Sequence, residues 1–246
     1  MERNLIILFL LVVLSPRQAT AQSNDFGMFY ELGVEKKLSP KWNVSAEADL
    51  RTRNNTRSLE RWSVGLSAEY KFNKRLKASA GYIALFYNNI EEMEWKKDGF
   101  TPNKWAPSYW GVRHRFNASV TGNLDLGRFN ISLRERYQFT FRPIATGKKY
   151  DFDEEEWKDI KAKSKHVLRS RLQLTYDIPH WKVDPFVNVE FFNGWALQKI
   201  RYQAGVEYKL KKAHTFSFTY RFQNNFADNK LESNIHLIGL GYKYKF

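Results

Sequence analysis

The sequence contains no cysteine, which excludes a disulfide framework and a lipid-modified cysteine as means of holding or anchoring the chain. Long apolar runs are also missing. After the first residues, no segment approaches the roughly 20 apolar residues that a membrane helix needs. The mean hydropathy is only -0.59. These values do not exclude a membrane protein, because a β-barrel wall needs only every second residue to be apolar.

The first residues have the pattern of a secretory signal peptide. Arg3 gives a basic start, Leu5 to Leu14 form a ten-residue apolar core, and residues 19–21 read Ala-Thr-Ala, a small-x-small cleavage site. The pattern predicts a cleaved signal peptide over 1–21 and one mature domain over 22–246.

Apolar and polar residues alternate with a period of two along most of the mature chain, which is the pattern of half-buried strands. A clear case is Phe216, Phe218, Tyr220 and Phe222 against Ser217, Thr219, Arg221 and Gln223. The alternation predicts strands at about 28–38, 42–53, 61–72, 76–87, 109–124, 129–142, 165–176, 184–194, 198–210, 214–223 and 235–246. Most are long enough for a tilted transmembrane strand, which needs about 9–11 residues.

The links between these segments alternate between short and long. The short ones lie at 39–41, 73–75, 125–128, 177–182 and 211–213, and most of the others are longer, up to 88–108 and 143–164. Outer-membrane barrels have short periplasmic turns and longer outer loops. The predicted fold is therefore all-β: an antiparallel transmembrane up-and-down β-barrel of about ten to twelve strands. Twelve is favoured because bacterial barrels usually have an even count. The odd segment then implies either a short strand hidden in a loop or a first segment outside the wall.

If the apolar positions face lipid, the residues between them line the lumen. The lumen-facing candidates are Arg113, Arg115, Arg134, Arg136, Arg169, Arg171, Asn188, Glu190, Arg201, Glu47 and Glu69. Their charges favour one of two arrangements. Salt bridges could fill and close the lumen, or rows of arginine could line a pore that prefers anions. A fully paired lumen is closed, so the two exclude one another.

Two polar residues, His114 and Glu135, fall in the lipid-facing phase of their strands. A charge that faces lipid at mid-membrane is costly. Either a local bulge turns these side chains inward, or they belong to a protein-facing patch such as an oligomer contact or a lateral active site.

The sequence predicts no catalytic residue, metal site or cofactor. The five histidines are scattered, without metal-ligand spacing, and no G-x-S-x-G motif is present. A lipid-modifying enzyme would need a Ser, a His and a carboxylate or amide to converge on one rim of the barrel, and at least two of the candidates would have to lie within hydrogen-bonding reach. The candidates are Ser170, His166, His114, Glu135 and His236. The acidic run over 151–156 is typical of a solvated loop, with weak divalent-cation binding as the alternative. The net charge of +14 is compatible with nucleic-acid binding, but the signal peptide and the alternation argue against it.

Several strand motifs resemble one family of outer-membrane barrels. They include residues 185–193 (PFVNVEFFN), 201–208 (RYQAGVEY), 169–172 (RSRL) and 236–242 (HLIGLGY). The sequence over these segments is similar to the family labelled domain of unknown function 2490. The family tends to have an acidic residue where Arg113 precedes His114. The resemblance implies the outer membrane of a Gram-negative bacterium and no established activity.

Three functions follow as hypotheses. The first is a structural or partner-binding barrel with a charge-paired, filled lumen, surrounded by outer-membrane lipid and lipopolysaccharide. Its outer loops, which carry Trp95, Trp105 and Trp157, would contact a protein partner. The second is a narrow anion-preferring pore through the arginine-lined lumen. The third is a lipid-modifying enzyme of the outer membrane. The oligomeric state is not readable from the sequence.

Overall fold

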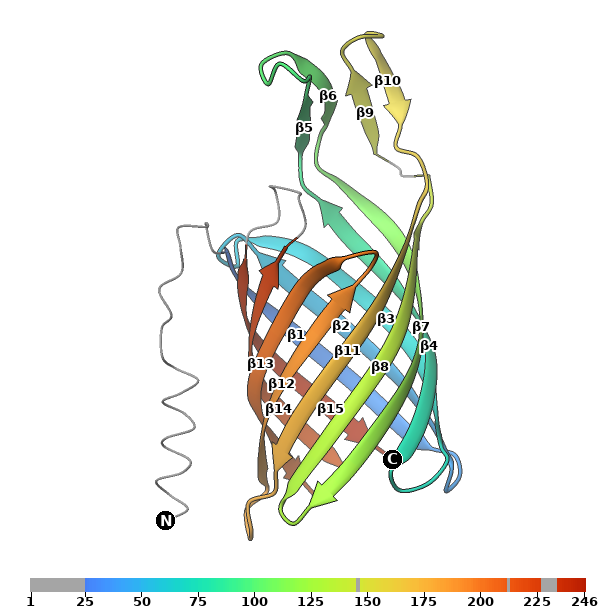
Figure 1. Ribbon diagram of the computed structural model, residues 1–246, viewed down its shortest axis with the longest axis vertical. Coiled ribbons are helices and arrows are strands. Elements are labelled where there is room, and N and C mark those ends of the chain that lie inside the picture. Colours follow the sequence, from blue (N-terminus) through green and yellow to red (C-terminus); the bar gives the residue numbers. More distant parts are fainter. Residues whose placement is uncertain (1–24, 145–146, 212, 227–233) are drawn as a thin grey trace.

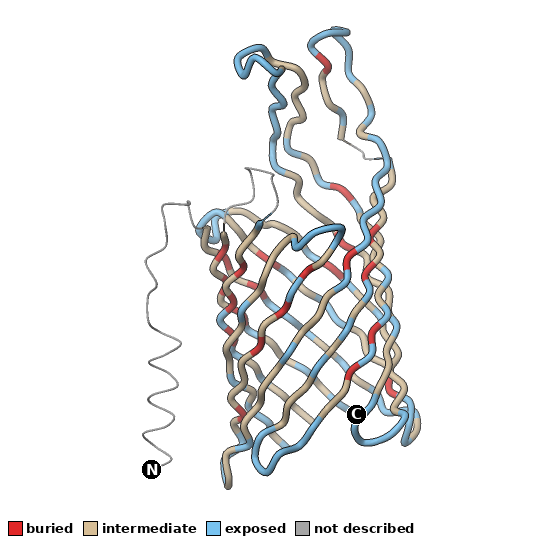
Figure 2. Tube along the Cα trace, viewed as in Figure 1, coloured by how far each residue is buried: buried red, intermediate tan, exposed pale blue. Residues whose placement is uncertain are grey.

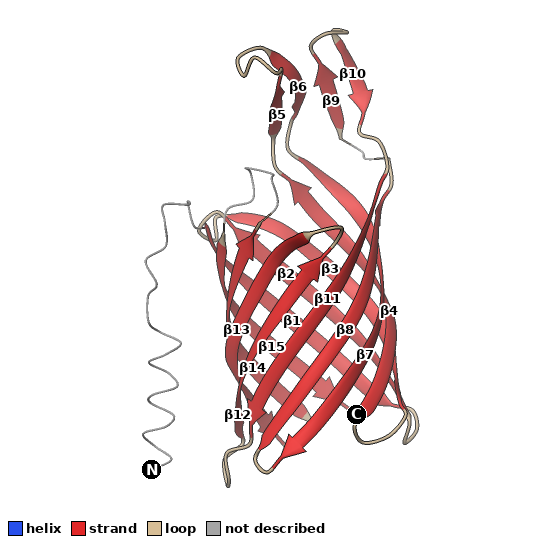
Figure 3. Cartoon of the chain, viewed as in Figure 1, coloured by secondary structure: helices blue, strands red, loops and turns tan. Residues whose placement is uncertain are grey.

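The computed structural model describes residues 25–144, 147–211, 213–226 and 234–246. The predicted signal peptide over 1–21 lies outside the described residues. In the part of the chain that is described, the secondary structure consists of strands and connections (Figure 3). No described helix is long and apolar enough to cross a membrane.

Eleven strands close into a barrel, and they follow one another around the wall in chain order (Figure 1). They are β1 (Asp25–Lys37), β2 (Trp42–Arg53), β3 (Ser58–Lys71), β4 (Leu76–Asn89), β7 (Tyr109–Leu126), β8 (Phe129–Arg142), β11 (Lys163–Tyr176), β12 (Val183–Asn193), β13 (Leu197–Leu210), β14 (His214–Asn225) and β15 (Ile235–Lys245). Each predicted segment corresponds to one of these strands, with its ends displaced by three residues or fewer.

The barrel closes through a parallel pair, β1 with β15, whereas every other neighbouring pair in the wall is antiparallel. In an up-and-down chain each strand reverses direction, so an odd number of strands leaves the first and last strands parallel. The count of eleven lies within the predicted range of ten to twelve and is one below the favoured twelve. The first segment belongs to the wall, and no twelfth barrel strand occurs among the described residues.

One end of the inner side of this closing seam is apolar and is formed by Phe29, Ile235, Leu237 and Gly239, whereas the other end carries the charged residues Glu35 and Lys243. Phe29 is directly opposite Gly239 in the parallel register, and a Cβ atom on Gly239 would lie 2.0 Å from the Phe29 ring. The ring therefore occupies the space that the glycine leaves open. Phe29 is 2% exposed and Leu237 is fully buried, so this end of the seam is closely packed.

Apolar side chains cover the outer face of the barrel, and the buried segments are short and scattered along the strands (Figure 2). Leu66, Phe116 and Leu133, for example, are each at least half exposed on the outside. This inverted distribution is typical of a wall in contact with lipid. The inner face, with its polar and charged residues, is therefore where specific chemistry can be placed.

Four further strands form a separate sheet at the end of the barrel that carries the long loops (Figure 1). They are β5 (Glu92–Trp95), β6 (Pro102–Ala106), β9 (Lys148–Asp151) and β10 (Glu156–Asp159), in the order β10-β9-β6-β5. We call this the outer sheet. The sequence predicted only loops over 88–108 and 143–164, so this sheet is a feature that the alternation did not indicate.

Candidate functional site

The lumen holds a cavity of about 880 Å³. The structure places ten of the eleven lumen-facing candidates on its lining: Arg113, Arg115, Arg134, Arg136, Arg169, Arg171, Asn188, Glu190, Arg201 and Glu47. Glu69 lies outside this lining, toward the end with the short turns, and its carboxylate is 2.8 Å from the Lys77 ammonium group. The lining carries eleven arginines and three lysines against seven acidic residues, so the lumen has an excess of positive charge.

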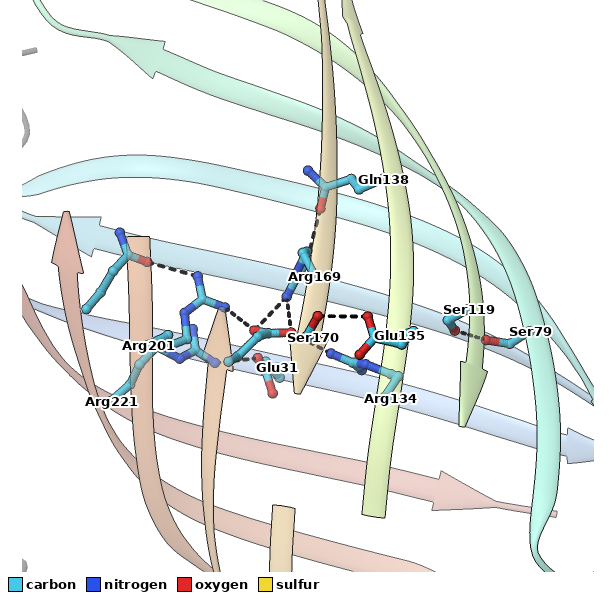
Figure 4. A network of polar contacts seen from close by, with 12 residues as sticks. Glu31, Ser79, Ser119, Arg134, Glu135, Gln138, Arg169, Ser170, Arg201 and Arg221 are labelled. Atoms are coloured by element: carbon cyan, nitrogen blue, oxygen red, sulfur yellow. Dashed lines mark hydrogen bonds and ion pairs between the residues drawn. The ribbon is translucent and has the colours of Figure 1, made fainter. Parts of the chain in front are cut away.

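Glu190 on β12 is the centre of an ion-pair cluster, and it is 1% exposed. Arg134 approaches its carboxylate to 2.7 Å, Arg169 to 2.9 Å and Arg201 to 3.3 Å. Figure 4 shows these three guanidinium groups converging from three different strands. A buried carboxylate with several charge-assisted hydrogen bonds is fully satisfied, and it joins β8, β11, β12 and β13.

Amides and one aromatic ring complete this cluster. Arg169 donates to the Gln138 Oε1 atom at 3.0 Å, and Arg201 donates to the Gln223 Oε1 atom at 2.9 Å. The Phe192 ring lies against the guanidinium groups of both arginines, with centroid distances of 4.5 and 4.7 Å. Cation–π contact of this kind favours a fixed orientation of each arginine.

Ion pairs also join β2 and β3, through two arginines that the sequence analysis did not single out. Arg61 is 2.9 Å from Asp49, and Arg51 is 3.7 Å from Glu60. Both arginines fall in the inward phase of predicted strands, so the alternation already carried the signal for them. These pairs link neighbouring strands rather than opposite sides of the barrel.

The arginines of β7 are bonded to polar neighbours. Arg113 donates to the Asn89 side chain at 2.6 Å and stacks on Tyr87, and Arg115 donates to the Thr140 hydroxyl at 3.3 Å. Among the arginines that the sequence analysis placed in the lumen, Arg136 and Arg171 form no ion pair or hydrogen bond with a described residue.

His114 and Glu135 both remain on the outer face of the wall. The strand register is continuous through the two residues, so no bulge turns either side chain inward. Glu135 accepts a hydrogen bond from the Ser170 hydroxyl at 2.7 Å, on the strand directly beside it (Figure 4). The His114 Nδ1 atom lies 2.7 Å from the Tyr82 hydroxyl.

The structure does not bring a histidine to the Ser170–Glu135 pair. His166 bonds Tyr137 and His236 bonds Tyr220, each through a tyrosine hydroxyl on the adjacent strand, at 2.6 and 2.7 Å. No hydrogen bond joins a described histidine to Ser170 or Glu135. The serine and the carboxylate that a lipid-modifying enzyme would need are therefore in contact, but no histidine is bonded to either of them.

The outer sheet has one aromatic face. Met93, Trp105, Tyr150 and Trp157 are directly opposite one another across its four strands. The ring centroids of Trp105 and Trp157 are 5.8 Å apart, and those of Tyr150 and Trp157 are 5.4 Å apart. Trp157 is 49% exposed and Met93 37% exposed. We call these four residues the aromatic ladder.

The opposite face of the outer sheet is ionic. Asp151 is buried and lies 3.2 Å from Lys158 and 3.9 Å from Lys104. Burial acts to raise the pKa of Asp151, but hydrogen bonds from Lys158 and the Asp153 backbone hold it below its usual value. The acidic run over 151–156 is thus partly paired with lysines. Among the residues that the structure describes, no group of three or more acidic or histidine side chains is placed to hold a metal ion.

The turn between β5 and β6 is held by Asp98. Its carboxylate accepts hydrogen bonds from the Thr101 hydroxyl and backbone and from the Phe100 backbone. These bonds lower the pKa of Asp98 to about 2. The carboxylate is therefore charged at neutral pH, and the turn that presents the aromatic ladder is ordered by local bonds.

The family model for a protein of unknown function, DUF2490, matches residues 26–234. The chain belongs to this family. The match spans the barrel from β1 through β14 and ends one residue before β15, and it confirms the resemblance seen in the strand motifs. No curated protein sequence matches the chain.

Two solved barrels have a similar fold. The β domain of the Bordetella autotransporter Brka is 15% identical, with a TM-score of 0.53 and 83% of each chain covered. The translocator domain of the autotransporter NalP from Neisseria meningitidis is 11% identical, with a TM-score of 0.52. That match covers 100% of this chain and 95% of the other. At these identities the likeness shows the fold alone: this DUF2490 member is an outer-membrane-type β-barrel.

Proposed function

We propose that this DUF2490 member is exported by a cleaved signal peptide to the outer membrane of a Gram-negative bacterium. There it acts as a barrel that binds a protein partner at the cell surface. The aromatic ladder of the outer sheet is the binding surface, and the ion-paired barrel is its rigid support. Lipid and lipopolysaccharide surround the wall.

The aromatic ladder is the observation that carries this proposal. Trp and Tyr are enriched at protein interfaces and among the residues that contribute most to binding. Here they stand in one row on a sheet outside the barrel, where contact with lipid does not account for them. The ionic opposite face and the bonded Asp98 turn hold the row in place before any partner arrives, which reduces the entropy lost on binding.

Site-specific photo-crosslinking in intact cells tests the proposal. A photoreactive phenylalanine analogue replaces Trp157 in the aromatic ladder, and we expect one discrete adduct of defined mass. Replacement of the neighbouring Trp105 by alanine should weaken binding by about 2 kcal/mol, as for a central interface residue. The adduct should then fall about tenfold or more.

Trp181 provides a matched control, because it is 68% exposed and lies in the short link between β11 and β12 at the other end of the barrel. The photoreactive analogue at position 181 should not give the same adduct. The proposal is contradicted if position 157 gives no adduct in cells that contain the folded barrel. It is also contradicted if positions 157 and 181 give the same one.

The second candidate function is a narrow anion-preferring pore. The excess of arginine and lysine on the lining of the 880 Å³ cavity favours it, because rings of positive charge select anions. The ion pairs around Glu190 favour the closed barrel, since they tie side chains into the lumen. Conductance measurements separate the two candidates.

A lipid-modifying activity has weaker support. Ser170 and Glu135 are hydrogen-bonded on the outer wall, but the candidate histidines bond tyrosines instead. A serine nucleophile needs a base within reach that is itself oriented by a third group. Labelling of Ser170 by a lipid-like fluorophosphonate would support a lipid-modifying activity. Labelling that persists in Ser170→Ala would exclude Ser170 as the nucleophile.

A further inference from the structure

Four arginines face one another on the inner side of two adjacent strands. In the antiparallel register of β8 with β11, Arg134 is directly opposite Arg171 and Arg136 is directly opposite Arg169. We call these four residues the arginine wall. Side chains opposite one another on a sheet have Cβ atoms about 4.5–5.5 Å apart, and like charges in such pairs are destabilising. The arrangement therefore needs negative charge close by.

One carboxylate supplies part of that charge. Glu190 bonds Arg134 and Arg169 of the arginine wall, and also Arg201 from β13. Arg171 is directly opposite Glu190 in the register of β11 with β12, yet it forms no ion pair with it. The other three arginines already occupy the two carboxylate oxygens.

Arg136 and Arg171 form no ion pair or hydrogen bond with a described residue, because Glu190 bonds Arg134, Arg169 and Arg201 instead. The Nε atom of each is buried and has no hydrogen-bond partner. The two are diagonal neighbours on the inner face, and both line the lumen cavity. An anion bonded to both guanidinium groups would offset the repulsion between the like charges of the arginine wall.

The chemistry of the pair selects a class of anion. Each guanidinium group presents a planar fork of donors that matches the oxygens of a phosphate or carboxylate. Two forks side by side can bind an anion with three or four oxygens, whereas a halide ion offers no such geometry. Because the wall is closed, the lumen is reached from the water at the barrel ends and not from the lipid.

We propose that Arg136 and Arg171 form a lumenal binding site for a soluble phosphate-type oxyanion. The excess of basic over acidic residues on the cavity lining holds the anion further. The site is independent of the aromatic ladder and of any partner. The lumen could therefore bind an anion even if the barrel does not conduct ions.

Titration of the refolded full barrel with inorganic phosphate tests this site. Isothermal titration calorimetry in zwitterionic detergent, at constant ionic strength set with chloride, should show saturable binding near one phosphate per chain. The thermal unfolding midpoint should rise with phosphate, because a ligand that binds only the folded state stabilises it. The double variant Arg136→Gln/Arg171→Gln should lose at least tenfold in affinity.

Arg75 gives a matched control, because it is exposed in the short turn between β3 and β4. Arg75→Gln should bind phosphate as the unmodified barrel does. The proposal is overturned if chloride stabilises the barrel as well as phosphate does, or if the double variant keeps its affinity. It is also overturned if Arg75→Gln lowers the affinity equally.

Should the double variant fail to fold, single lysine substitutions keep the charge and remove only the planar fork. Arg136→Lys and Arg171→Lys should each fold and should each weaken phosphate binding several-fold. Unchanged affinity in both would overturn the site. Calorimetry on the unmodified barrel is decisive in any case, since an absence of saturable phosphate binding contradicts the proposal directly.

Discussion

The closing seam and the arginine wall lie in the same barrel and are stabilised in opposite ways. At the seam, the buried ring of Phe29 fills the space over Gly239 and packs with Ile235 and Leu237. At the arginine wall, like charges face one another and depend on a single carboxylate, Glu190. The seam is held by packing of its own side chains, whereas two arginines of the arginine wall, Arg136 and Arg171, form no ion pair or hydrogen bond with a described residue.

The difference shows how a barrel with an odd number of strands can be closed by apolar packing in one place and carry a charged cluster in another. A parallel pair has slightly weaker hydrogen bonding per residue than an antiparallel pair, and here the seam adds apolar packing at that pair. The cluster around Glu190 lies on other strands, β8, β11, β12 and β13, where antiparallel pairing holds the charged groups in register. Substitutions in the two regions should therefore change the free energy of unfolding by different amounts, and not always in the same direction.

The largest effect is expected at the seam. In Gly239→Leu the new side chain would overlap the Phe29 ring, and the cost should exceed the about 1–3 kcal/mol typical of overpacking. We expect loss of the heat-resistant closed barrel on an electrophoretic mobility assay. Gly122→Leu is the matched control, because nothing lies within 4 Å of a Cβ atom there. Adding Phe29→Ala to Gly239→Leu should restore closure in part, and no restoration would show that the ring is not the obstacle.

The next effect concerns the carboxylate of the arginine wall. Glu190→Gln removes the only charge that three guanidinium groups share, and breaking a buried ion pair costs about 3–5 kcal/mol. Urea unfolding of the refolded protein measures the loss. Glu47→Gln serves as control, since Glu47 also lines the cavity but forms no ion pair with a described residue. Equal losses in the two variants would show that overall charge matters rather than the cluster.

Two arginines of the same strand should behave differently. Arg134→Gln removes a charge-assisted bond to Glu190 and should cost about 1.5–3 kcal/mol in the free energy of unfolding. Arg136→Gln removes a guanidinium group that has no ion pair or hydrogen bond with a described residue and that lies opposite Arg169, so without phosphate it should leave the stability unchanged or raise it. The comparison is made by urea unfolding in chloride buffer. A larger loss for Arg136→Gln than for Arg134→Gln would contradict the assignment of partners.

The smallest effect is expected at the contact between Arg221 and the Phe29 ring of the seam. The Arg221 guanidinium group lies 3.9 Å from the centroid of the Phe29 ring and 3.6 Å from Glu31. Arg221→Lys keeps the charge but loses planar stacking, and we expect a loss of about 0.5–1 kcal/mol. A double-mutant cycle with Phe29→Leu isolates the contact. A coupling energy near zero would show that the ring and the guanidinium group act independently.

Much of the barrel could be predicted because a membrane wall inverts the usual burial pattern. The strict alternation in segments such as 214–223 identified each barrel strand and placed ten of the eleven lumen candidates on the cavity lining. The strand count was harder, because the preference for even barrels outweighed the eleven segments that the sequence itself contains. Parallel closure follows from that odd count and not from any residue in β1 or β15.

The outer sheet and the ion-pair partners could not be predicted in the same way. The strands of the outer sheet have four or five residues, too few for a period of two to be distinguished from chance. Each does carry an aromatic residue or methionine of the ladder, such as Trp105 or Trp157, which is the signal that remained. Which arginine reaches Glu190 depends on side-chain direction across several strands: Arg171 is opposite it and does not bond, whereas Arg134 does.

Single-channel recording of the refolded mature protein in planar bilayers tests the central claim, a barrel closed by its own ion-paired side chains. The account predicts no steady conductance in the unmodified protein. It predicts that openings appear in Glu190→Gln, where the cluster around the carboxylate is released. A steady anion-selective current in the unmodified protein, reduced in Arg134→Gln and Arg169→Gln, would contradict the closed barrel and establish a pore.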